Sequence, residues 1–212
     1  MRLVFISDTH TLHDQINLPT GDILIHSGDF SGRGTLYEAM MFNQWLRKQD
    51  FEHKLVICGN HEMHMDHKPV SEIRAILSTA TYLHGEAVNI GDIKFWGGPW
   101  TPEFCNWAFN IPRSELKPYW DNIPDDTNVL ITHGPPYNVL DETPDYYGSG
   151  TVNCGDSALK NRIKFLKDLK IHCFGHIHEQ YGQVIKNGVQ FINASTCNRN
   201  YEAVNPPIVV DL

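Results

Sequence analysis

The sequence lacks the features of several common protein classes. Its 212 residues contain no run of 18 apolar residues, which excludes a transmembrane helix. The five cysteines are odd in number and show no CxxC spacing, so they offer no zinc-ribbon pattern and favour reduced thiols. The apolar run Leu3–Ile6 is too short for the core of a signal peptide and leads directly into Asp8. We therefore expect a cytoplasmic protein that does not bind a membrane.

Basic residues are scarce relative to acidic ones. Lys and Arg total 17 against 25 Asp and Glu, a formal net charge of −8 with neutral histidine. Proteins that bind nucleic acid usually carry a basic footprint, so nucleic acid is disfavoured as a partner. Repeats, linkers and low-complexity tracts are also absent, and a hydrophobic fraction of 41% excludes disorder. The length favours one domain spanning residues 1–212.

Short apolar runs alternate with helix-like stretches along the chain. Several runs lack polar alternation, which is typical of strands buried on both faces. Strands are expected at Leu3–Ile6, Ile23–Ile25, Leu55–Cys58, Ile93–Trp96, Val129–Ile131, Ile171–Phe174, Val189–Ile192 and Ile208–Val210, and helices at Leu36–Gln49, Val70–Ser78 and Ser157–Leu169. The Lys186-Asn187-Gly188 run signals a hairpin turn. The alternation predicts an α/β layered domain.

Histidine is abundant, with 12 copies, and five of them lie just after expected strands. Imidazole is the commonest metal ligand in proteins and carries protons near neutral pH. Five polar blocks follow the strands, namely Asp8-Thr9-His10, Gly28-Asp29, Gly59-Asn60-His61-Glu62, Thr132-His133-Gly134 and Gly175-His176-Ile177-His178. Sites in open α/β folds form outside the carboxyl ends of the strands. A single block could be an ordinary loop, but five in this order make chance a poor explanation.

The series of blocks resembles the signature of the calcineurin-like metallophosphoesterase superfamily. Shorter runs resemble one branch, the small metallophosphoesterase-domain proteins related to class III cyclic nucleotide phosphodiesterases. These runs are Gly98-Pro99-Trp100-Thr101-Pro102, His133-Gly134-Pro135-Pro136, Asn153-Cys154-Gly155 and Phe191-Ile192-Asn193-Ala194-Ser195. The resemblance implies a layered β-sandwich of mixed sheets flanked by helices.

The resemblance also implies a dinuclear metal site. By motif, the ligands of one ion would be Asp8, His10 and His178, those of the other Asn60, His133 and His176, and the bridging ligand Asp29. Carboxylate, amide and imidazole donors together suit manganese, iron, zinc or nickel better than calcium, and manganese is expected. Two such ions would lower the pKa of a bridging water, and the resulting hydroxide would attack phosphorus in line with the leaving oxygen.

Other histidines and acids receive supporting roles. His61 resembles the family histidine that protonates the leaving group, although it could instead only pack or orient. Glu62 is interpreted as a partner of an imidazole or as half of a surface salt bridge. His26 and His172 lie within apolar strands, so we expect core residues or partners of the ligands.

Substrate contacts are expected from residues beside the blocks, namely His13, Asn60, Trp100, Asn153 and Cys154. The Gly/Pro-rich segment from Trp96 to Phe109 is aromatic, and Trp100, Phe104 and Trp107 could form a pocket wall against a base or be buried. The backbone amides near Asn153 could face a phosphate or cap the following helix.

These observations predict a metal-dependent phosphodiesterase that acts on a small nucleotide, including cyclic ones. The alternatives are a phosphomonoesterase acting on nucleotides, sugars or phosphoprotein and, disfavoured by the acidic charge, a nuclease. A non-catalytic scaffold of the same fold is disfavoured because none of the seven candidate ligands is missing. The protein is expected to be a monomer or homodimer.

Overall fold

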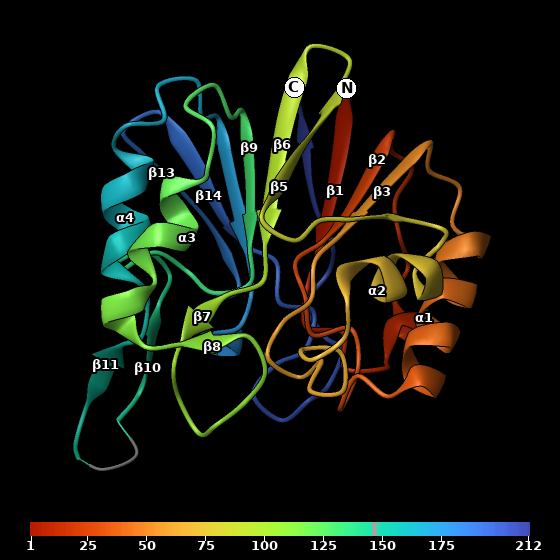
Figure 1. Ribbon diagram of the computed structural model, residues 1–212, viewed down its shortest axis with the longest axis horizontal. Coiled ribbons are helices and arrows are strands. Elements are labelled where there is room, and N and C mark those ends of the chain that lie inside the picture. Colours follow the sequence, from red (N-terminus) through yellow and green to blue (C-terminus); the bar gives the residue numbers. More distant parts are fainter. Residues whose placement is uncertain (146–147) are drawn as a thin grey trace.

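Two mixed β-sheets pack face to face in the computed structural model, which describes residues 1–145 and 148–212 (Figure 1). The first sheet has the strand order β15-β1-β2-β3-β4. Its members are β15 (Ile208–Asp211), β1 (Arg2–Ile6), β2 (Ile23–His26), β3 (His53–Val56) and β4 (Thr81–Tyr82). Strands β1 to β4 run parallel, and β15 pairs antiparallel with β1 at the edge.

The second sheet has the order β13-β14-β12-β9-β6-β5. Its members are β13 (Gly182–Lys186), β14 (Val189–Asn193), β12 (Ile171–Phe174), β9 (Val129–Thr132), β6 (Ile93–Gly98) and β5 (Glu86–Ile90). The four central strands are parallel, and an antiparallel hairpin partner closes each edge. The expected hairpin turn is confirmed, because Asn187 and Gly188 both have positive φ, as a two-residue type I′ turn requires.

Helices cover the outer face of each sheet (Figure 1). Helices α1 (Leu36–Lys48) and α2 (Val70–Ile76) lie on the first sheet, and α3 (Lys117–Asp121) and α4 (Ser157–Ile163) lie on the second. Short elements complete the chain, namely β7 (Thr101–Pro102), β8 (Asn110–Ile111), β10 (Glu142–Pro144), β11 (Thr151–Asn153), η1 (His13–Gln15), η2 (Arg113–Glu115) and η3 (His178–Gln180). The expected fold class, mixed sheets flanked by helices, is confirmed.

Side-chain alternation along the strands divides the core into layers. In β1, Leu3 and Phe5 point between the two sheets, while Val4 and Ile6 point toward α1. All four are fully buried, and each buried side chain of this size contributes about 1.5–3 kcal/mol. After the exposed Arg2, strand β1 is therefore apolar at every position, because both of its faces are covered.

Several element boundaries differ from the sequence-based expectation, and the ends of β3 and α4 are the two that bear on the site and the core. Strand β3 ends at Val56, so Ile57 and Cys58 lead out of the ladder toward the turn at Gly59. Helix α4 ends at Ile163, six residues before the expected end, because the chain continues in short turns in which Leu166 donates to the carbonyl of Ile163. The apolar periodicity continues past the helix because Leu166 and Leu169 are buried in the adjoining core.

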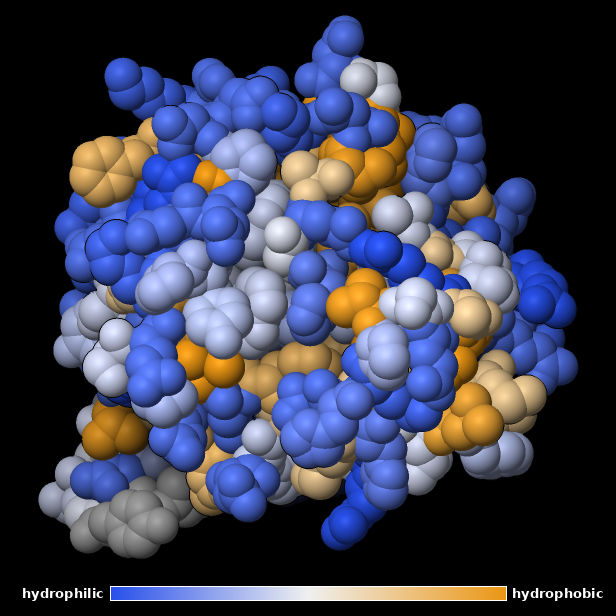
Figure 2. Space-filling model, in the orientation of Figure 1, coloured by the Kyte–Doolittle hydropathy of each residue, from blue (hydrophilic) through white to orange (hydrophobic). Residues whose placement is uncertain are grey.

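The surface in the orientation of Figure 2 is largely hydrophilic, with hydrophobic residues scattered in small patches. Within residues 1–145 and 148–212, no helix has both the length and the apolar character needed to cross a membrane.

Candidate metal centre

The five polar blocks lie at one edge of the sandwich. Strands β1, β2 and β3 of the first sheet and β12 of the second each end shortly before a block, and β9 ends within one, at Thr132. Backbone hydrogen bonds tie the blocks to one another: the amide of Asp8 donates to Gly28, that of His10 to Asp29, and that of Gly175 to His133. The turns that carry the candidate ligands are therefore fixed by the backbones of neighbouring turns.

Four candidate ligands have backbones in the left-handed region. The φ angles are 49° at Asp8, 41° at His10, 55° at Asp29 and 68° at His176. Residues other than glycine rarely adopt such angles, and each costs about 1–3 kcal/mol, so the surrounding contacts must hold them. Each turn directs its side chain into the space between the strand ends.

The first cluster joins Asp8, His10 and His178. The Nε2 atoms of His10 and His178 are 3.2 Å apart, and Oδ1 of Asp8 lies 3.3 Å from Nε2 of His178 and 4.0 Å from that of His10. Donor atoms about 2.0–2.2 Å from a common ion have comparable spacings. Asp8 is fully buried, and its carboxylate also accepts bonds from the His176 amide and the Ser195 hydroxyl.

The second cluster joins Asp29, Asn60 and His133. Nε2 of His133 lies 2.8 Å from Oδ1 of Asn60 and 3.3 Å from Oδ2 of Asp29. The ring of His176 completes this side, with its centroid 5.0 Å from that of His133. Asp29 also links the two clusters, because one of its carboxylate oxygens lies within 4.8 Å of a ring nitrogen of His10. The structure thus brings all seven candidate ligands to one place.

Backbone carbonyls orient three of the imidazoles. Nδ1 of His133, of His178 and of His61 each lies about 3 Å from a carbonyl oxygen, the partners being Ser27, Asn198 and Gly32. A carbonyl oxygen only accepts, so Nδ1 carries the hydrogen and Nε2 faces the carboxylates. Histidine ligands of metals commonly show this arrangement, in which the second ring nitrogen donates to a carbonyl.

The space around the carboxylates admits no side chain at two glycines. A Cβ at Gly175 would lie 1.9 Å from Oδ2 of Asp8, and one at Gly59 would lie 2.4 Å from Oδ1 of Asp29. The glycines let the backbone approach the acids closely. Imidazole nitrogens and carboxylate oxygens converge on this cradle within 4.8 Å of one another in each candidate group, so the residues present fit divalent first-row metals.

The electrostatics of the metal-free cluster are dominated by carboxylate–imidazole pairs. Burial by itself would raise the pKa of Asp29, but His133, His61 and His10 outweigh it and hold that pKa well below its usual range. Burial would likewise lower the pKa of His133, yet Asp29 and Asp8 raise it to about 9. The carboxyl groups of Asp8 and Asp29, both with a lowered pKa, are therefore charged at neutral pH, which is the state that binds a cation.

His61, the expected proton donor, lies directly beside the cluster. Its ring centroid is 4.4 Å from that of His10, its amide donates to Oδ1 of Asp29, and its Nε2 lies 3.9 Å from Oδ2 of Asp29. The side chain is 12% exposed, whereas that of His133 is fully buried. His61 therefore stands at the solvent side of the cluster, where a substrate would enter.

Glu62 has a different role from both interpretations of its sequence position. It is fully buried, and its carboxylate accepts the backbone amides of Asp29, Gly59 and Ser31 and the hydroxyl of Ser31. It contacts no imidazole through these bonds and forms no surface ion pair. Glu62 clamps the turn after β2 to the turn after β3, because its two oxygens satisfy donors from both.

We expect Glu62→Gln to weaken metal binding. An amide has only one acceptor oxygen, so its N–H groups would oppose backbone donors, and unfolding should become easier by about 1–3 kcal/mol. Misplaced turns should raise the dissociation constant for Mn²⁺ by about 10–100-fold, as measured by calorimetry. Glu38→Gln is the matched control, since Glu38 accepts the amides of Gly32 and Thr35 at the start of α1. Equal losses of metal affinity in the two variants would contradict this role.

His26 and His172 are buried supports of the site turns. His26 accepts the Gly28 amide at Nδ1, so its Nε2 donates to the Thr9 hydroxyl. Nε2 of His172 donates to the hydroxyl of Thr132, which in turn donates to the carbonyl of Gly134. Burial lowers the pKa of each imidazole to about 3.

The neutral state of His172 predicts a pH effect on stability. The unfolded chain binds a proton at this residue below about pH 6.5, whereas the folded chain does not until about pH 3. The stabilisation is therefore fully present above pH 6.5 and is lost as pH falls toward 3. In His172→Gln, the slope of unfolding free energy between pH 6 and 4 should decrease by about 1.4 kcal/mol per unit. Denaturant titrations measure this slope, with His53→Gln as the control because the His53 side chain is 40% exposed. An unchanged slope would contradict the buried neutral state.

The structure does not bring every expected substrate contact to the cluster. His13 is buried against Phe42 and Trp45, with ring centroids 5.5 and 5.1 Å away, on the α1 side of the first sheet. Its position after the first block does not bring it into the site, because η1 turns the ring toward the core. Trp100 packs on Tyr119, 4.5 Å between centroids, within an aromatic cluster.

Asn153 and Cys154 take part in a network around Asp141. The side chain of Asn153 and the amide of Gly155 donate to the buried carboxylate of Asp141, and the amide of Cys154 donates to its carbonyl. Burial raises the pKa of the Cys154 thiol, which disfavours a nucleophilic thiolate. The cap of α4 is Asp156, whose side chain accepts the amides of the first helical turn.

Three aromatic side chains border the cluster instead. Trp107 lies 4.4 Å from His61 and Phe104 lies 5.1 Å from His176, between ring centroids. Tyr201 was not expected from the sequence, and its ring lies 4.8 Å from that of His10 and 5.4 Å from that of His178. Asn198, whose carbonyl accepts from His178, was likewise missed. Ser195 ends the Phe191–Ser195 run that carried the branch resemblance, but its contact with Asp8 was not expected.

Comparisons with known proteins agree with this geometry. A family model described as calcineurin-like phosphoesterase matches residues 1–180. The human "metallophosphoesterase domain-containing protein 1" is 37% identical over 100% of this chain and 71% of its own length, and a UPF0046 protein of Caenorhabditis elegans is 35% identical over 99% and 74%. Among solved structures, phosphopantetheinyl hydrolase from Mycobacterium tuberculosis superposes with a TM-score of 0.61 at 15% identity, covering 97% of this chain and 95% of the other.

Proposed function

The chain belongs to the calcineurin-like phosphoesterase family and is a metallophosphoesterase, and we propose that it is a phosphodiesterase acting on small nucleotides, including cyclic ones. The observation that carries the reaction class is the pair of buried carboxylates, Asp8 and Asp29, each faced by imidazoles on one edge of the sandwich. Such a donor set matches two metal ions that share a phosphoryl group.

The assignment of ligands follows the two clusters. Asp8, His10 and His178 would hold one ion, Asn60, His133 and His176 the other, and Asp29 both. These mixed nitrogen and oxygen donors suit divalent first-row metals, of which we propose manganese, with iron, zinc or nickel as the other candidates. When bound, two divalent ions lower the pKa of water and offset the negative charge of phosphoryl oxygens. The protein's part is to fix the donors before substrate arrives.

His61 would provide the proton for the leaving oxygen. Its Nδ1 hydrogen is held by the carbonyl of Gly32, which directs Nε2 toward Asp29 and the solvent side of the cluster. An imidazole in this position transfers a proton or a hydrogen bond to the departing alkoxide without moving.

The aromatic border supports a nucleotide as the substrate. Trp107 and Phe104 extend from the loop between β7 and β8, and Tyr201 extends from the loop before β15, so that rings lie on two sides of the imidazoles. A base stacks on such rings, and each stacking contact contributes about 1–3 kcal/mol. The acidic charge outside the site disfavours long nucleic acids.

A metal-by-substrate panel tests the proposed function. Protein stripped of metal and reloaded with Mn²⁺, Fe²⁺, Zn²⁺, Ni²⁺ or Mg²⁺ would be assayed on a simple aryl monoester, an aryl diester, and 2′,3′- and 3′,5′-cyclic nucleotides. We expect the highest kcat/KM on a nucleotide diester with Mn²⁺. A clear preference for monoesters would replace this proposal with a phosphomonoesterase. Hydrolysis of none of these substrates with any metal would exclude both.

Two tryptophans of the same segment provide a matched test of base stacking. Trp107→Leu removes the ring beside His61 and should raise KM for a nucleotide about tenfold, while KM for methyl aryl phosphates changes little. Trp100→Leu removes a ring that packs on Tyr119 and should lower the melting temperature without changing KM. Steady-state kinetics on both substrates distinguish the two effects. An equal rise of KM on both substrates in Trp107→Leu would contradict base stacking.

The compartment and assembly remain part of the proposal. All five cysteines are free thiols, and three of them are buried, which suits a reducing compartment such as the cytoplasm. The centre draws its residues from one chain, so a monomer is sufficient for the chemistry, and a homodimer is compatible with it.

A further inference from the structure

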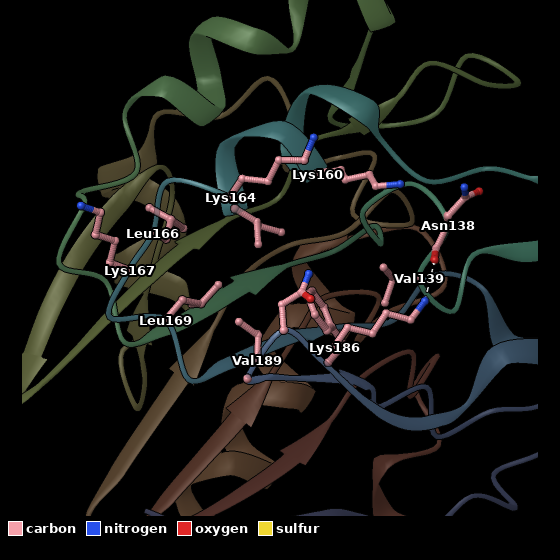
Figure 3. A pocket seen from close by; sticks show the side chains of 13 residues that line it. Asn138, Val139, Lys160, Lys164, Leu166, Lys167, Leu169, Lys186 and Val189 are labelled. Atoms are coloured by element: carbon pink, nitrogen blue, oxygen red, sulfur yellow. Dashed lines mark hydrogen bonds between the residues drawn. The ribbon is translucent and has the colours of Figure 1, made fainter.

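A groove of about 690 Å³ lies on the outer face of the second sheet, between α4 with its following turns and the hairpin of β13 and β14 (Figure 3). None of its thirteen lining residues is a candidate metal ligand. Pockets that bind small molecules commonly have volumes of about 300–1,000 Å³. This groove is therefore large enough for a ligand of its own.

The floor of the groove is apolar and mainly aliphatic, with Phe191 as its one aromatic residue among those described. Leu166 and Leu169 come from the turns after α4, Val189 from the start of β14, and Val139 from the loop after β9. Their residues are 4–9% exposed, so the groove is an indentation in a packed core rather than a gap between loops. Figure 3 shows these four side chains between the surrounding polar ones.

The rim of the groove is basic. Four of the chain's 17 Lys and Arg residues line it, namely Lys160, Lys164, Lys167 and Lys186, and no acidic residue does. Within residues 1–145 and 148–212, none of these four lysines forms an ion pair with a carboxylate. Positive charge thus gathers, without internal neutralisation, around one apolar floor in a protein of net charge −8.

The ammonium groups are distributed unevenly along the groove. Figure 3 shows the ammonium groups of Lys160 and Lys186 at the end near Asn138, where Lys186 donates to the Asn138 carbonyl, and Lys167 at the opposite end. Lys160 also lies over the ring of Tyr137, with 5.3 Å from Nζ to the centroid. An ammonium group has three donors, so Lys186 retains two for a ligand.

We propose that this groove binds a small anionic amphiphile, with the acidic head between Lys160 and Lys186 and an aliphatic tail over the leucine and valine floor. Charge complementarity selects an anion, and an aliphatic floor with four branched side chains selects a hydrocarbon tail over a polar body. The binding is independent of the metal centre and of the proposed hydrolysis.

Titration of ¹⁵N-labelled protein with sodium dodecanoate below its micelle concentration tests the proposal. Excess inorganic phosphate keeps the metal centre occupied. We expect amide shifts at residues 166–169 and 186–189, and an affinity that falls by at most about fourfold for each methylene removed from the tail. Shifts confined to the metal-site loops, or none, would overturn the proposal. Dodecyl phosphate in a parallel titration distinguishes a phosphoryl head from a carboxylate.

Charge variants test the head-binding end. The double variant Lys160→Gln, Lys186→Gln should bind dodecanoate about tenfold more weakly, whereas Arg47→Gln, Lys48→Gln on α1 should bind normally. Dodecyltrimethylammonium has the same tail and should not bind. Equal binding of this cation, or an unchanged affinity in the first double variant, would overturn the proposal. Binding to anionic phosphatidylglycerol vesicles without binding to dispersed dodecanoate would replace it with membrane contact.

Discussion

Asp29→Ala should bind no more than one metal ion per chain and lose nearly all activity. Asp29 is 2% exposed, belongs to two of the three candidate ion-binding groups, and lies 3.3 Å from Nε2 of His133. Without the Asp29 carboxylate, the second cluster loses its anionic ligand. The first cluster, which contains Asp8, loses the residue that links it to the second. Metal analysis after dialysis and the rate on the best substrate of the panel measure both losses.

The magnitude follows from charge stabilisation. Removal of one preorganised group that stabilises transition-state charge costs about 10²–10³ in rate, and loss of an ion removes several such interactions at once, so we expect at least about 10⁴. Asp29→Asn preserves the shape and the bond from the His61 amide and separates charge from packing. If Asp29→Asn keeps two ions and full activity, the bridging role is wrong.

A buried acid outside the centre provides the matched control. Asp141 is 1% exposed and accepts bonds from the amides of Asn138 and Gly155. Asp141→Asn should lower the melting temperature, because it unbalances that network, yet leave the metal content at two. A loss of metal in both variants would indicate general unfolding rather than loss of a ligand.

His61→Ala should keep both metal ions but reduce kcat by about 10²–10⁴, which is the usual contribution of a positioned proton donor. The side chain contacts the cluster without belonging to the proposed ligands, and its Nε2 lies 3.9 Å from the nearest oxygen of Asp29. The turn should remain in place, because it is the backbone amide of His61 that bonds to Asp29.

The leaving group distinguishes proton donation from packing. A nitrophenolate departs without a proton, whereas an alkoxide needs one, so the reduction in His61→Ala should be largest for alkyl esters. His61→Gln keeps a hydrogen-bond donor, but its amide cannot release a proton near neutral pH. This variant should therefore recover little of the rate on alkyl esters. Equal losses of rate for the aryl and the alkyl leaving group in His61→Ala would contradict proton donation and leave His61 only an orienting role. Kinetics on an aryl and an alkyl diester of the same nucleotide measure the difference.

Much of the fold could be predicted because the strands report their surroundings directly. Strand β1 is apolar at both alternating sets of positions, which only a strand covered on both faces tolerates. The Asn187-Gly188 turn was readable because a two-residue hairpin needs positive φ twice. The end of α4 was not readable, since Leu166 and Leu169 remain buried in non-helical turns and continue the apolar spacing.

The candidate site was predictable from the topology of the sheets rather than from local pattern. Its ligands follow strands in five separate blocks, and parallel strands bring their carboxyl ends to one edge. Nearness in sequence gave a wrong expectation for His13, which was expected to contact the substrate. It is three residues from His10, but the chain turns away and the ring packs on Phe42. Distance in sequence concealed the other contacts, since Tyr201 reaches His10 from a loop 191 residues later.

The sequence by itself therefore determined the layered architecture, because local pattern suffices for it, and the resemblance of its five blocks to a family signature supplied the candidate ligands. The tertiary structure alone decided how those side chains are held. Left-handed turns at Asp8 and Asp29, and the glycines that leave room for their carboxylates, are set by neighbouring loops. The same holds for Glu62, whose clamp between two turns exists only once β2 and β3 lie side by side.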